Sequence, residues 1–335
     1  ENILRLDEPI AQADHGSLLR HVDSSAVGDA GSVRCRETIL RNDGPVPQTD
    51  YDHAGYDERQ RVLYLFSGPA GREDGLAAFL GEYGIDTMEC DIVNEHLQWQ
   101  DLLDDSTWNW IRQLLCSGHF QFLFASPPCR SFSECRTLRP GPPQLRDWEH
   151  IYGFPKSQAK LRHLQPAHYE QIRTDNLFAE RVAEAAHIIL GVGGGFGVEQ
   201  PQPWQGAVCM FDLHSFQALE KFGAKRAVFD QCKFGAPCRK PTCYFYGGTF
   251  TDFSDLDSVV CDHLPVRQYT ALGEQYLAPH PSFVGRRNPS SGRYDTKDLS
   301  AYSTALNSRT AYGISQALSR SWGISAAASP PVQGF

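Results

Sequence analysis

Short, continuous apolar runs alternate with amphipathic stretches from residue 61 onward. The first run, residues 62–66, is followed by a turn of small residues and then by a helical pattern that carries Leu76, Phe79 and Leu80. An uninterrupted apolar run of this length is typical of a strand that is buried on both faces of a sheet. On this basis we predict strands over residues 62–66, 85–90, 122–125, 196–199, 227–230 and 243–246.

Helical periodicity fills most of the intervals between these runs. Trp108, Ile111, Leu114 and Leu115 recur at helical spacing after a capping residue near position 105. Further helices are predicted over residues 174–190, 215–222 and 309–322, whereas residues 130–171 are rich in proline, arginine and aromatic residues and predict a long functional loop. The alternation predicts an α/β fold with a doubly wound, mostly parallel sheet.

Changes in composition and in hydrophobic pattern divide the chain into four parts. Residues 1–60 are polar and acidic and predict an extension without a core of its own, and residues 61–247 carry the strand–helix alternation. Residues 248–308 are rich in Ser, Pro, Asp and Gly and predict a small C-terminal subdomain. Residues 309–335 predict a final helix packed on the main domain, followed by a tail.

Composition narrows the class of protein. Apolar residues make up 41% of the 335 residues and charged residues 21%, which is enough for a real core. No apolar stretch is long enough to span a bilayer and no leader pattern is present, so we expect an intracellular protein that does not associate with membranes, nuclear if it is eukaryotic. The ten cysteines are scattered, and we interpret them as reduced thiols.

Charge is unevenly distributed although the formal net charge is −9. Residues 130–173 carry eight basic against four acidic side chains, and residues 221–247 carry six against one. Because local charge matters more than the total for a polyanionic partner, these stretches are either a nucleic-acid surface or two ordinary solvated surfaces.

Candidate chemistry lies where the predicted strands end, since ligands of parallel sheets bind beyond the carboxyl ends of the strands. Cys129 follows two prolines and precedes Arg130, which favours the thiolate, although a buried structural cysteine is an alternative. Glu199 ends another strand. A thiolate nucleophile with a nearby carboxyl group is suited to addition to an electron-poor ring. Glu89 and Asp91 end the second strand and either bind a ribose or cap a loop.

These segments resemble the S-adenosylmethionine-dependent DNA (cytosine-5) methyltransferases, in particular a divergent branch whose cofactor turn begins with Phe-Ser-Gly-Pro. The similarity covers about residues 61–247, and its most specific part is the Pro-Pro-Cys segment with its Ser-Phe-Ser follower. The matching pieces, in the order of that family, are residues 65–71, 89–91, 101, 127–133, 198–201 and 234–242.

The resemblance implies a Rossmann-like methyltransferase domain over 61–247, a small target-recognition-like segment over 248–308, and S-adenosylmethionine as the cofactor. It implies that Cys129 attacks C6 of a flipped-out cytosine and that Glu199 contacts N3, so that C5 accepts the methyl group. Lys240 and Thr242 correspond to the family's arginine pair and complete the implied catalytic set. The implied cofactor-binding residues are Phe66, Ser67, Gly68, Pro69, Gly71, Glu89, Asp91, Asp101 and Pro127. The implied nucleic-acid contacts are Arg130, Ser131, Ser133, Arg136 and Arg139.

The chain departs from the family at three places. Gln200 and Pro201 stand where the family has an asparagine after the glutamate, Lys240 and Thr242 stand in place of two arginines, and no Gly-Asn cofactor motif is evident near the C-terminus. Three functions therefore stay open: methyl transfer to DNA, which we expect, methyl transfer to a structured RNA such as tRNA, and a catalytically silent module that binds cofactor or nucleic acid.

A second group of residues carries side chains that can bind a metal. Cys232, Cys238, Cys243, Cys261 and His263 are close in sequence and suggest zinc. None of them forms a Cys-x2-Cys pair, and Cys238 and Cys243 fall inside the methyltransferase-like segment, so the sequence predicts no metal site.

Overall fold

The structure is a computed structural model. It describes residues 60–93, 100–133, 136–137, 142–202, 207–269, 273, 275–278, 280 and 301–321. The expected extension over residues 1–60, apart from residue 60, lies outside these residues, as do residues 281–300 of the expected recognition segment and the tail beyond residue 321. Among the described helices, none is both long and apolar enough to cross a bilayer.

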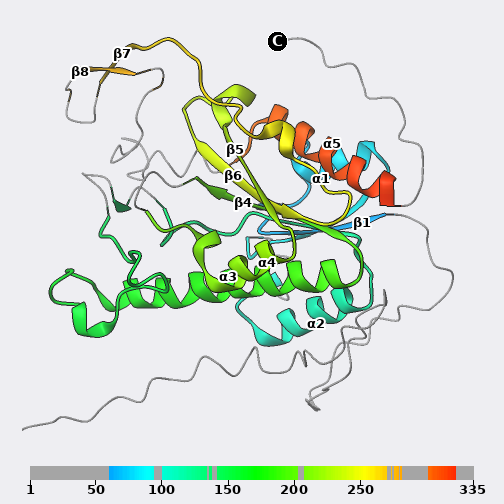
Figure 1. Cartoon of the computed structure of the whole chain (residues 1–335), viewed down its shortest axis with the longest axis horizontal. Helices are drawn as coiled ribbons and strands as arrows, with labels where there is room; N and C mark the ends of the chain where they lie inside the picture. The colour runs from blue at the N-terminus through cyan, green and yellow to red at the C-terminus, as the bar shows by residue number, and fades with distance from the viewer. Residues whose placement is uncertain are drawn as a thin grey trace, which may run out of the picture. The chain divides into compact units, whose positions relative to one another are not determined.

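Six strands form one sheet in the order β2-β1-β3-β4-β6-β5 (Figure 1). Their bounds are Arg61–Leu65 for β1, Asp86–Cys90 for β2, Phe122–Ala125 for β3, Gly195–Pro201 for β4, Lys225–Asp230 for β5 and Pro241–Gly247 for β6. Each predicted strand is present to within two residues. β1 pairs in parallel with β2 and β3, and β3 pairs in parallel with β4. The mixed α/β class and the mostly parallel sheet are thereby confirmed, whereas the doubly wound connectivity stays a prediction.

The direction of β6 departs from the simple strand–helix alternation. β6 pairs in antiparallel fashion with both β4 and β5. Only residues 231–240 connect β5 to β6. A parallel crossover needs roughly a dozen residues or more, usually with a helix, so a connection this short returns the chain as an antiparallel neighbour.

Five α-helices and four 3-10 turns complete the described part of the chain. The helices are α1 Leu76–Glu82, α2 Asp105–Cys116, α3 Pro166–Gly191, α4 His214–Lys221 and α5 Thr304–Ser321, and the 3-10 turns are η4 Lys156–Gln158, η5 Met210–Asp212, η6 Gln231–Phe234 and η7 Ser254–Leu256. α3 begins eight residues before its predicted start, inside the predicted loop. Pro166 occupies its first turn, and Gln165 and His168 form a reciprocal capping box.

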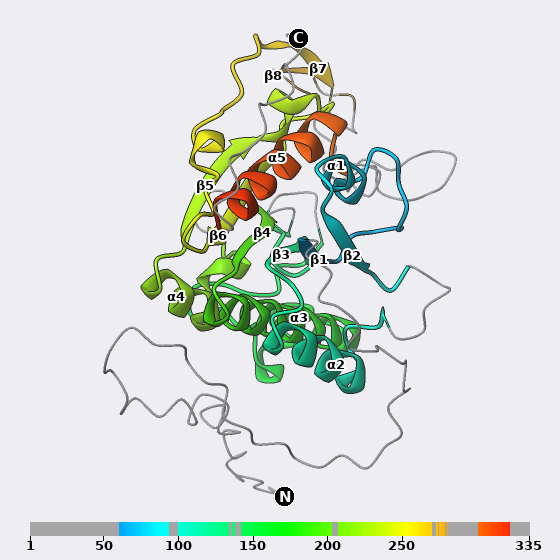
Figure 2. The same cartoon turned by 90° about the vertical axis from the view of Figure 1, so that its right-hand side faces the viewer.

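Helices lie against both faces of the sheet. α2, α3 and α4 lie on one side, and α1 and α5 on the other (Figure 1, Figure 2). Successive residues of β1 alternate between the two cores: Leu63 and Leu65 pack on the first side, Val62 and Tyr64 on the second. Because side chains of a strand alternate between faces, a strand covered on both sides must be apolar throughout, which explains the unbroken run in the sequence.

A separate antiparallel hairpin occupies the expected recognition segment. It consists of β7 Val266–Tyr269 and β8 Gln275–Ala278, with Val266 paired to Ala278 and Tyr269 paired to Gln275. Val266 and Tyr269 are more than half exposed, so the hairpin contributes these side chains to no core.

Two helical glycines differ in their surroundings and give a matched test of core packing. A Cβ at Gly313 of α5 would lie 2.5 Å from Cε1 of the buried Phe253, whereas at Gly81 of α1 no described atom lies within 4 Å. Alanine favours a helix by about 1 kcal/mol over glycine, and overpacking a core costs about 1–3 kcal/mol. We expect Gly81→Ala to raise the free energy of unfolding by about 0.5–1 kcal/mol and Gly313→Ala to lower it by about 1–2 kcal/mol in urea unfolding. Equal stabilisation by both would contradict the close packing of α5 on Phe253.

Candidate functional site

The carboxyl end of β1 lies at the point where the strand order reverses. From β1 the chain passes to β2 on one side and then to β3 on the other. In open parallel sheets, ligands bind in the crevice at such a switch point. The predicted site residues follow the ends of β1, β2, β3 and β4, and therefore gather at this one edge.

The turn after β1 is tightly constrained. Phe66 has a positive φ of 59°, which is uncommon for a residue with a side chain, and Gly68 and Gly71 have φ values of 75° and 73°. The Phe66 amide donates to the carbonyl of Cys90 at 2.7 Å, and its ring packs edge-to-face on Phe178 at 4.9 Å. The Ser67 hydroxyl donates to the Gly68 carbonyl, and the turn ends exposed from Pro69 to Gly71.

The two predicted ribose carboxylates brace this turn. Asp91 Oδ2 accepts the Gly68 amide at 2.9 Å and its Oδ1 accepts the Val93 amide at 3.0 Å. Glu89 Oε2 accepts the Gly71 amide at 3.2 Å. Burial raises the pKa of Glu89, and the hydrogen bond from Gly71 opposes part of that increase. Both acids therefore cap backbone amides of this loop, which is one of the two alternatives the sequence leaves open, and ribose binding stays a prediction.

Hydrogen bonds from Gln100 connect the carboxyl end of β2 to the segment that precedes α2. Its side chain accepts the Asp91 amide at 3.1 Å and donates to the Glu89 carbonyl at 3.2 Å. Asp101, the predicted adenine contact, follows directly, and its Oδ1 accepts the Leu103 amide at 2.8 Å. Gln100 is a site residue that the sequence reasoning missed.

The segment that carries Cys129 continues from β3. The Ser126 amide donates to the Leu65 carbonyl at 3.1 Å, so the register with β1 extends past the strand. Pro127 is buried, and its carbonyl accepts the Gln200 side chain at 2.5 Å. The Cys129 carbonyl accepts the Phe132 amide at 2.8 Å, and the residue itself is half-buried. Gln200, which departs from the family's asparagine, therefore holds the cysteine segment against β4.

A buried carboxylate anchors the residues after Cys129. Asp175 of α3 is fully buried, and its Oδ1 accepts both Nε and Nη2 of Arg130 at 3.0 and 2.7 Å. Its Oδ2 accepts the Ser131 amide at 2.8 Å. Arg146 donates to the Ser131 hydroxyl at 2.7 Å and stacks on Phe132, 3.6 Å from the ring centre. Burial lowers the pKa of Arg146 to about 9.

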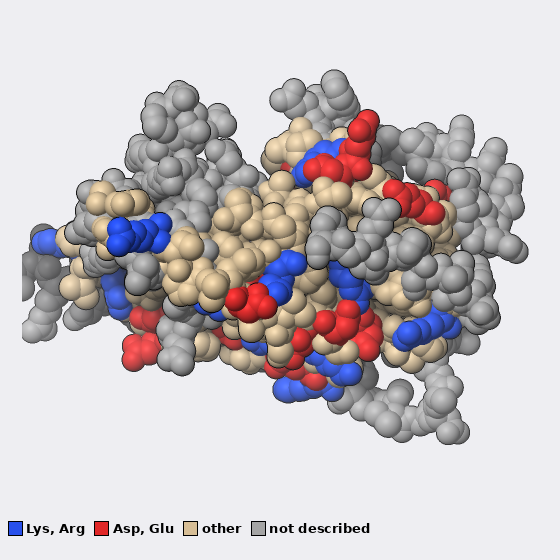
Figure 3. All heavy atoms as spheres, turned by 90° about the horizontal axis from the view of Figure 1, so that it is seen from above, with Lys and Arg blue, Asp and Glu red and all other residues tan. Residues whose placement is uncertain are grey.

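Some of the predicted nucleic-acid contacts also make hydrogen bonds within the protein. Arg136 donates to the carbonyls of Arg130 and Pro143 and to the side chain of Gln171. Ser133 is half-buried beside this network, and Arg139 lies outside the described residues. Figure 3 shows Lys and Arg side chains interspersed with Asp and Glu over the described part of one face. Arg130 and Arg136 thus both make hydrogen bonds to protein groups.

Glu199 lies on β4, the strand beside β3. It is 5% exposed, and its Oε1 is a buried oxygen without a hydrogen-bond partner among the described residues. The Tyr302 hydroxyl donates to Ser126 Oγ at 2.8 Å, and Ser126 Oγ in turn lies 3.5 Å from the Tyr64 hydroxyl. Burial, followed by the negative charge of Glu199, raises the pKa of Tyr302 well above its usual value, so this hydroxyl stays protonated beside the carboxylate.

Lys240 and Thr242 reach the same edge from β6. The antiparallel register sets Thr242 opposite Pro201. Lys240 is half-buried, with its ammonium 5.5 Å from the centre of the Tyr302 ring. Thr242 is fully buried, and its hydroxyl accepts the Gln231 side chain at 2.9 Å and donates to the Lys240 carbonyl at 3.1 Å. The threonine thus holds the backbone that presents the lysine.

Tyr302 and Asp175 are further residues that the sequence reasoning missed. Asp175 left no distinct signal, because the turn before it, residues 171–174, is mostly polar. Tyr302 left none, since it lies 103 positions after Glu199 in a polar segment.

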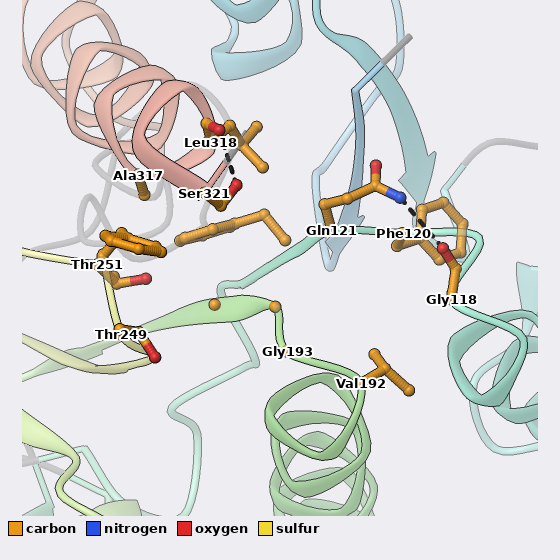
Figure 4. A pocket seen from close by; sticks show the side chains of 14 residues that line it. Gly118, Phe120, Gln121, Val192, Gly193, Thr249, Thr251, Ala317, Leu318 and Ser321 are labelled. Carbon is orange, nitrogen blue, oxygen red and sulfur yellow. Dashed lines mark hydrogen bonds between the residues drawn. The ribbon is translucent and has the colours of Figure 1, made fainter. Parts of the chain in front are cut away.

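A cavity at the opposite edge of the sheet offers no comparable chemistry. It has a volume of about 210 Å³ and is lined by the residues that precede β3 and β4, the residues that follow β6 and the end of α5 (Figure 4). Gln121, Thr249, Thr251 and Ser321 are its polar side chains, and no acidic, basic, histidine or cysteine side chain lines it.

Comparison with known proteins gives little further information. No family model and no curated protein matches the sequence. Among solved structures, the chain is similar to the methyltransferase EhMeth of Entamoeba histolytica, with a TM-score of 0.32 and 15% sequence identity. The alignment covers 58% of this chain and 55% of that protein, so the chain spans little more than half of that protein's length.

The Asp175 anchor can be tested by removing its carboxylate. We expect Asp175→Ala to lower the free energy of unfolding by about 2–3 kcal/mol, because hydrogen bonds to a charged group contribute about 1.5–3 kcal/mol and Arg130 regains water. Cleavage by trypsin after Arg130 and Arg136 should also become faster. Glu170→Ala is the control, because its carboxylate pairs with Arg173 on the exposed face of the same helix. Equal effects of the two variants in urea unfolding and proteolysis would show that Asp175 does not anchor the segment.

Proposed function

We propose that the protein is an S-adenosylmethionine-dependent methyltransferase that acts on C5 of cytosine in DNA through a covalent bond between Cys129 and C6. One observation carries the proposal. The half-buried Cys129 and the unpartnered carboxylate oxygen of Glu199 lie at the ends of two directly paired parallel strands, joined by the hydrogen bond from Gln200 to Pro127. A buried acceptor without a donor is costly, and a ligand N–H would satisfy it.

The chain's own groups fit each step of this chemistry. The Cys129 thiolate adds to C6 while Glu199 hydrogen-bonds N3 and supports its protonation, which leaves C5 as a carbon nucleophile. S-adenosylmethionine supplies an electrophilic methyl group for C5. Loss of the C5 proton to a base, return of the N3 proton to Glu199 and expulsion of the Cys129 thiolate then release 5-methylcytosine and restore the enzyme. Since C6 is inaccessible in a stacked duplex, the base must first leave the stack.

The turn after β1 fits the cofactor. Its backbone conformation brings chain atoms close to the switch point, and Glu89 Oε1 has no hydrogen bond within the described part of the chain, which leaves it available to ribose hydroxyls. Asp91 would orient the turn, and Asp101 would contact the adenine. The Tyr302 hydroxyl would fix the Glu199 carboxylate, and Lys240 would place a positive charge nearby.

Cofactor binding can be measured by titration calorimetry with S-adenosylmethionine. We expect Glu89→Ala to weaken binding about 10- to 100-fold, because a hydrogen bond to a charged group contributes about 1.5–3 kcal/mol and each 1.4 kcal/mol is tenfold. Glu73→Ala, an exposed acid on the following residues of the same loop, should keep the wild-type affinity. Absence of binding by the wild-type protein at millimolar cofactor would refute the cofactor assignment.

Catalysis can be tested with labelled cofactor and separate DNA and RNA pools. We expect Cys129→Ala to abolish methyl transfer with cofactor affinity retained, and Glu199→Gln to slow transfer by about 10²–10⁴, the range for a positioned general acid. Wild-type protein should form a denaturation-resistant adduct with DNA that contains 5-fluorocytosine, since fluorine at C5 prevents the final proton loss. Cys116→Ala, a cysteine at the end of α2, should retain activity and adduct formation.

Each other outcome identifies a competing function. Adduct formation with the RNA pool alone would replace the DNA substrate by RNA. Cofactor binding without methyl transfer to either pool would indicate a silent module. Full activity of Cys129→Ala would exclude the covalent route.

A further inference from the structure

Four side chains with metal-binding atoms meet beside the β5–β6 connection. They are Cys232 in η6, Cys261 and His263 before β7, and His280 after β8. One ligand atom from each lies within 4.8 Å of every other. Cys261 Sγ is 3.4 Å from His263 Nδ1 and 3.4 Å from His280 Nε2, and the two imidazole rings are 4.7 Å apart between their centres.

These separations match a tetrahedral zinc site. Zinc–sulfur and zinc–nitrogen bonds of about 2.3 and 2.0 Å at tetrahedral angles place neighbouring sulfur and nitrogen ligands about 3.5 Å apart. Two thiolates and two imidazoles are also the donor set that selects zinc over the hard cations magnesium and calcium.

We propose that Cys232, Cys261, His263 and His280 bind one zinc ion, which fastens the β7–β8 hairpin to the edge of the main sheet. The protein fills all four positions, so no position is left for water or substrate and the ion has a structural function. This ligand set differs from the group of residues considered from the sequence. That group included Cys238 and Cys243, and the sequence predicted no metal site. Cys243 of β6 instead packs in the hydrophobic core, and His280 is the fourth ligand of the cluster.

The protein already supports the ligand segments. The buried carboxylate of Asp230 accepts the Cys261 amide at 2.8 Å and Nε of Arg239 at 2.9 Å. Across the same junction, Lys233 donates to both carboxylate oxygens of Asp262 at 2.8 and 2.9 Å. Residues on either side of Cys232 and Cys261 are therefore tied together independently of a metal, which preorganises the site.

The β7–β8 hairpin requires stabilisation of the kind that a bound metal provides. Two isolated antiparallel strands are marginally stable in water, and small segments without a core are commonly stabilised by a metal. His263 and His280 flank the paired ends Val266 and Ala278, so a single ion closes the hairpin at its base. Binding free energy then becomes folding free energy for this segment.

The proposed site also adjoins the candidate active site. Gln231, next to Cys232, donates its amide to the Lys240 carbonyl at 3.1 Å and its side chain to Thr242. The Ser303 hydroxyl donates to the Phe234 carbonyl at 2.5 Å, beside Tyr302. The 3-10 turn that supplies one zinc ligand thus contacts both segments that surround Glu199.

The experiment uses the full chain purified under reducing conditions. Elemental analysis should give about one zinc per chain for wild-type protein, and less than a third of that for Cys232→Ser, Cys261→Ser and His280→Ala. Cys238→Ser, a buried cysteine of the same connection outside the cluster, is the matched control and should keep the full zinc content. Replacement of zinc by cobalt in the wild-type protein should produce the visible bands of tetrahedral cobalt with a thiolate charge-transfer band, a readout that does not depend on a variant that folds poorly.

Removal of the metal by a chelator should release the hairpin. We expect trypsin to cleave after Arg267 at least tenfold faster in the chelated protein, with protection restored by added zinc. A Cys232–Cys261 disulfide in the protein as purified under reducing conditions would overturn the proposal. So would wild-type protein that takes up neither zinc nor cobalt, or zinc retained by all three ligand variants.

Discussion

The buried carboxylate of Asp175 is the constraint on which the geometry of the candidate site depends. A charge in the interior is tolerated only when it is paired and hydrogen-bonded, and Asp175 meets this condition with Arg130 and the backbone of Ser131. Those two residues directly follow Cys129, so the charge on α3 fixes where the thiol-bearing segment can lie. On the other side, Gln200 fixes Pro127. The cysteine is held between two anchors that belong to different elements.

A row of hydrogen-bonded hydroxyl groups connects the end of β3 to the surroundings of the Glu199 carboxylate. Tyr64, Ser126 and Tyr302 come from β1, the end of β3 and the segment before α5, and together they reach Glu199. The Glu199 carboxylate lies close enough to Tyr302 to raise the pKa of the tyrosine, and Glu199 Oε1 has no hydrogen-bond partner among the described residues. Among the buried side-chain atoms without a partner in the described part of the chain, Glu199 Oε1 is the one carboxylate oxygen, which marks this strand end as a candidate binding site.

The sequence predicts those parts of the site that depend on local pattern. Unbroken apolar runs identify the strands, and the rule for parallel sheets then brings Phe66, Glu89, Cys129 and Glu199 to one edge without knowledge of their contacts. Long-range partners carry no such signal: Tyr302 lies in a polar stretch, and His280 lies 48 residues from Cys232. Composition reports charge but not its partners: Arg146 is buried against Phe132, whereas Arg130 is exposed and its role as a nucleic-acid contact stays a prediction. The β6 direction follows from a connection length that strand–helix alternation alone does not take into account.

The return of the chain to Tyr302 has a consequence for how this architecture can diversify. Gly247 ends the last strand of the main sheet, and Tyr302 and α5 rejoin the same core, so the chain between them is a connection with both ends fixed. The entropy of closing a loop grows only logarithmically with its length, about 0.6 kcal/mol for each doubling. Insertions or deletions between these two points therefore alter what is presented beside the candidate site at little cost to the framework. Such a connection is a natural place for related proteins to acquire new surfaces while the edge that carries Cys129 and Glu199 is left in place.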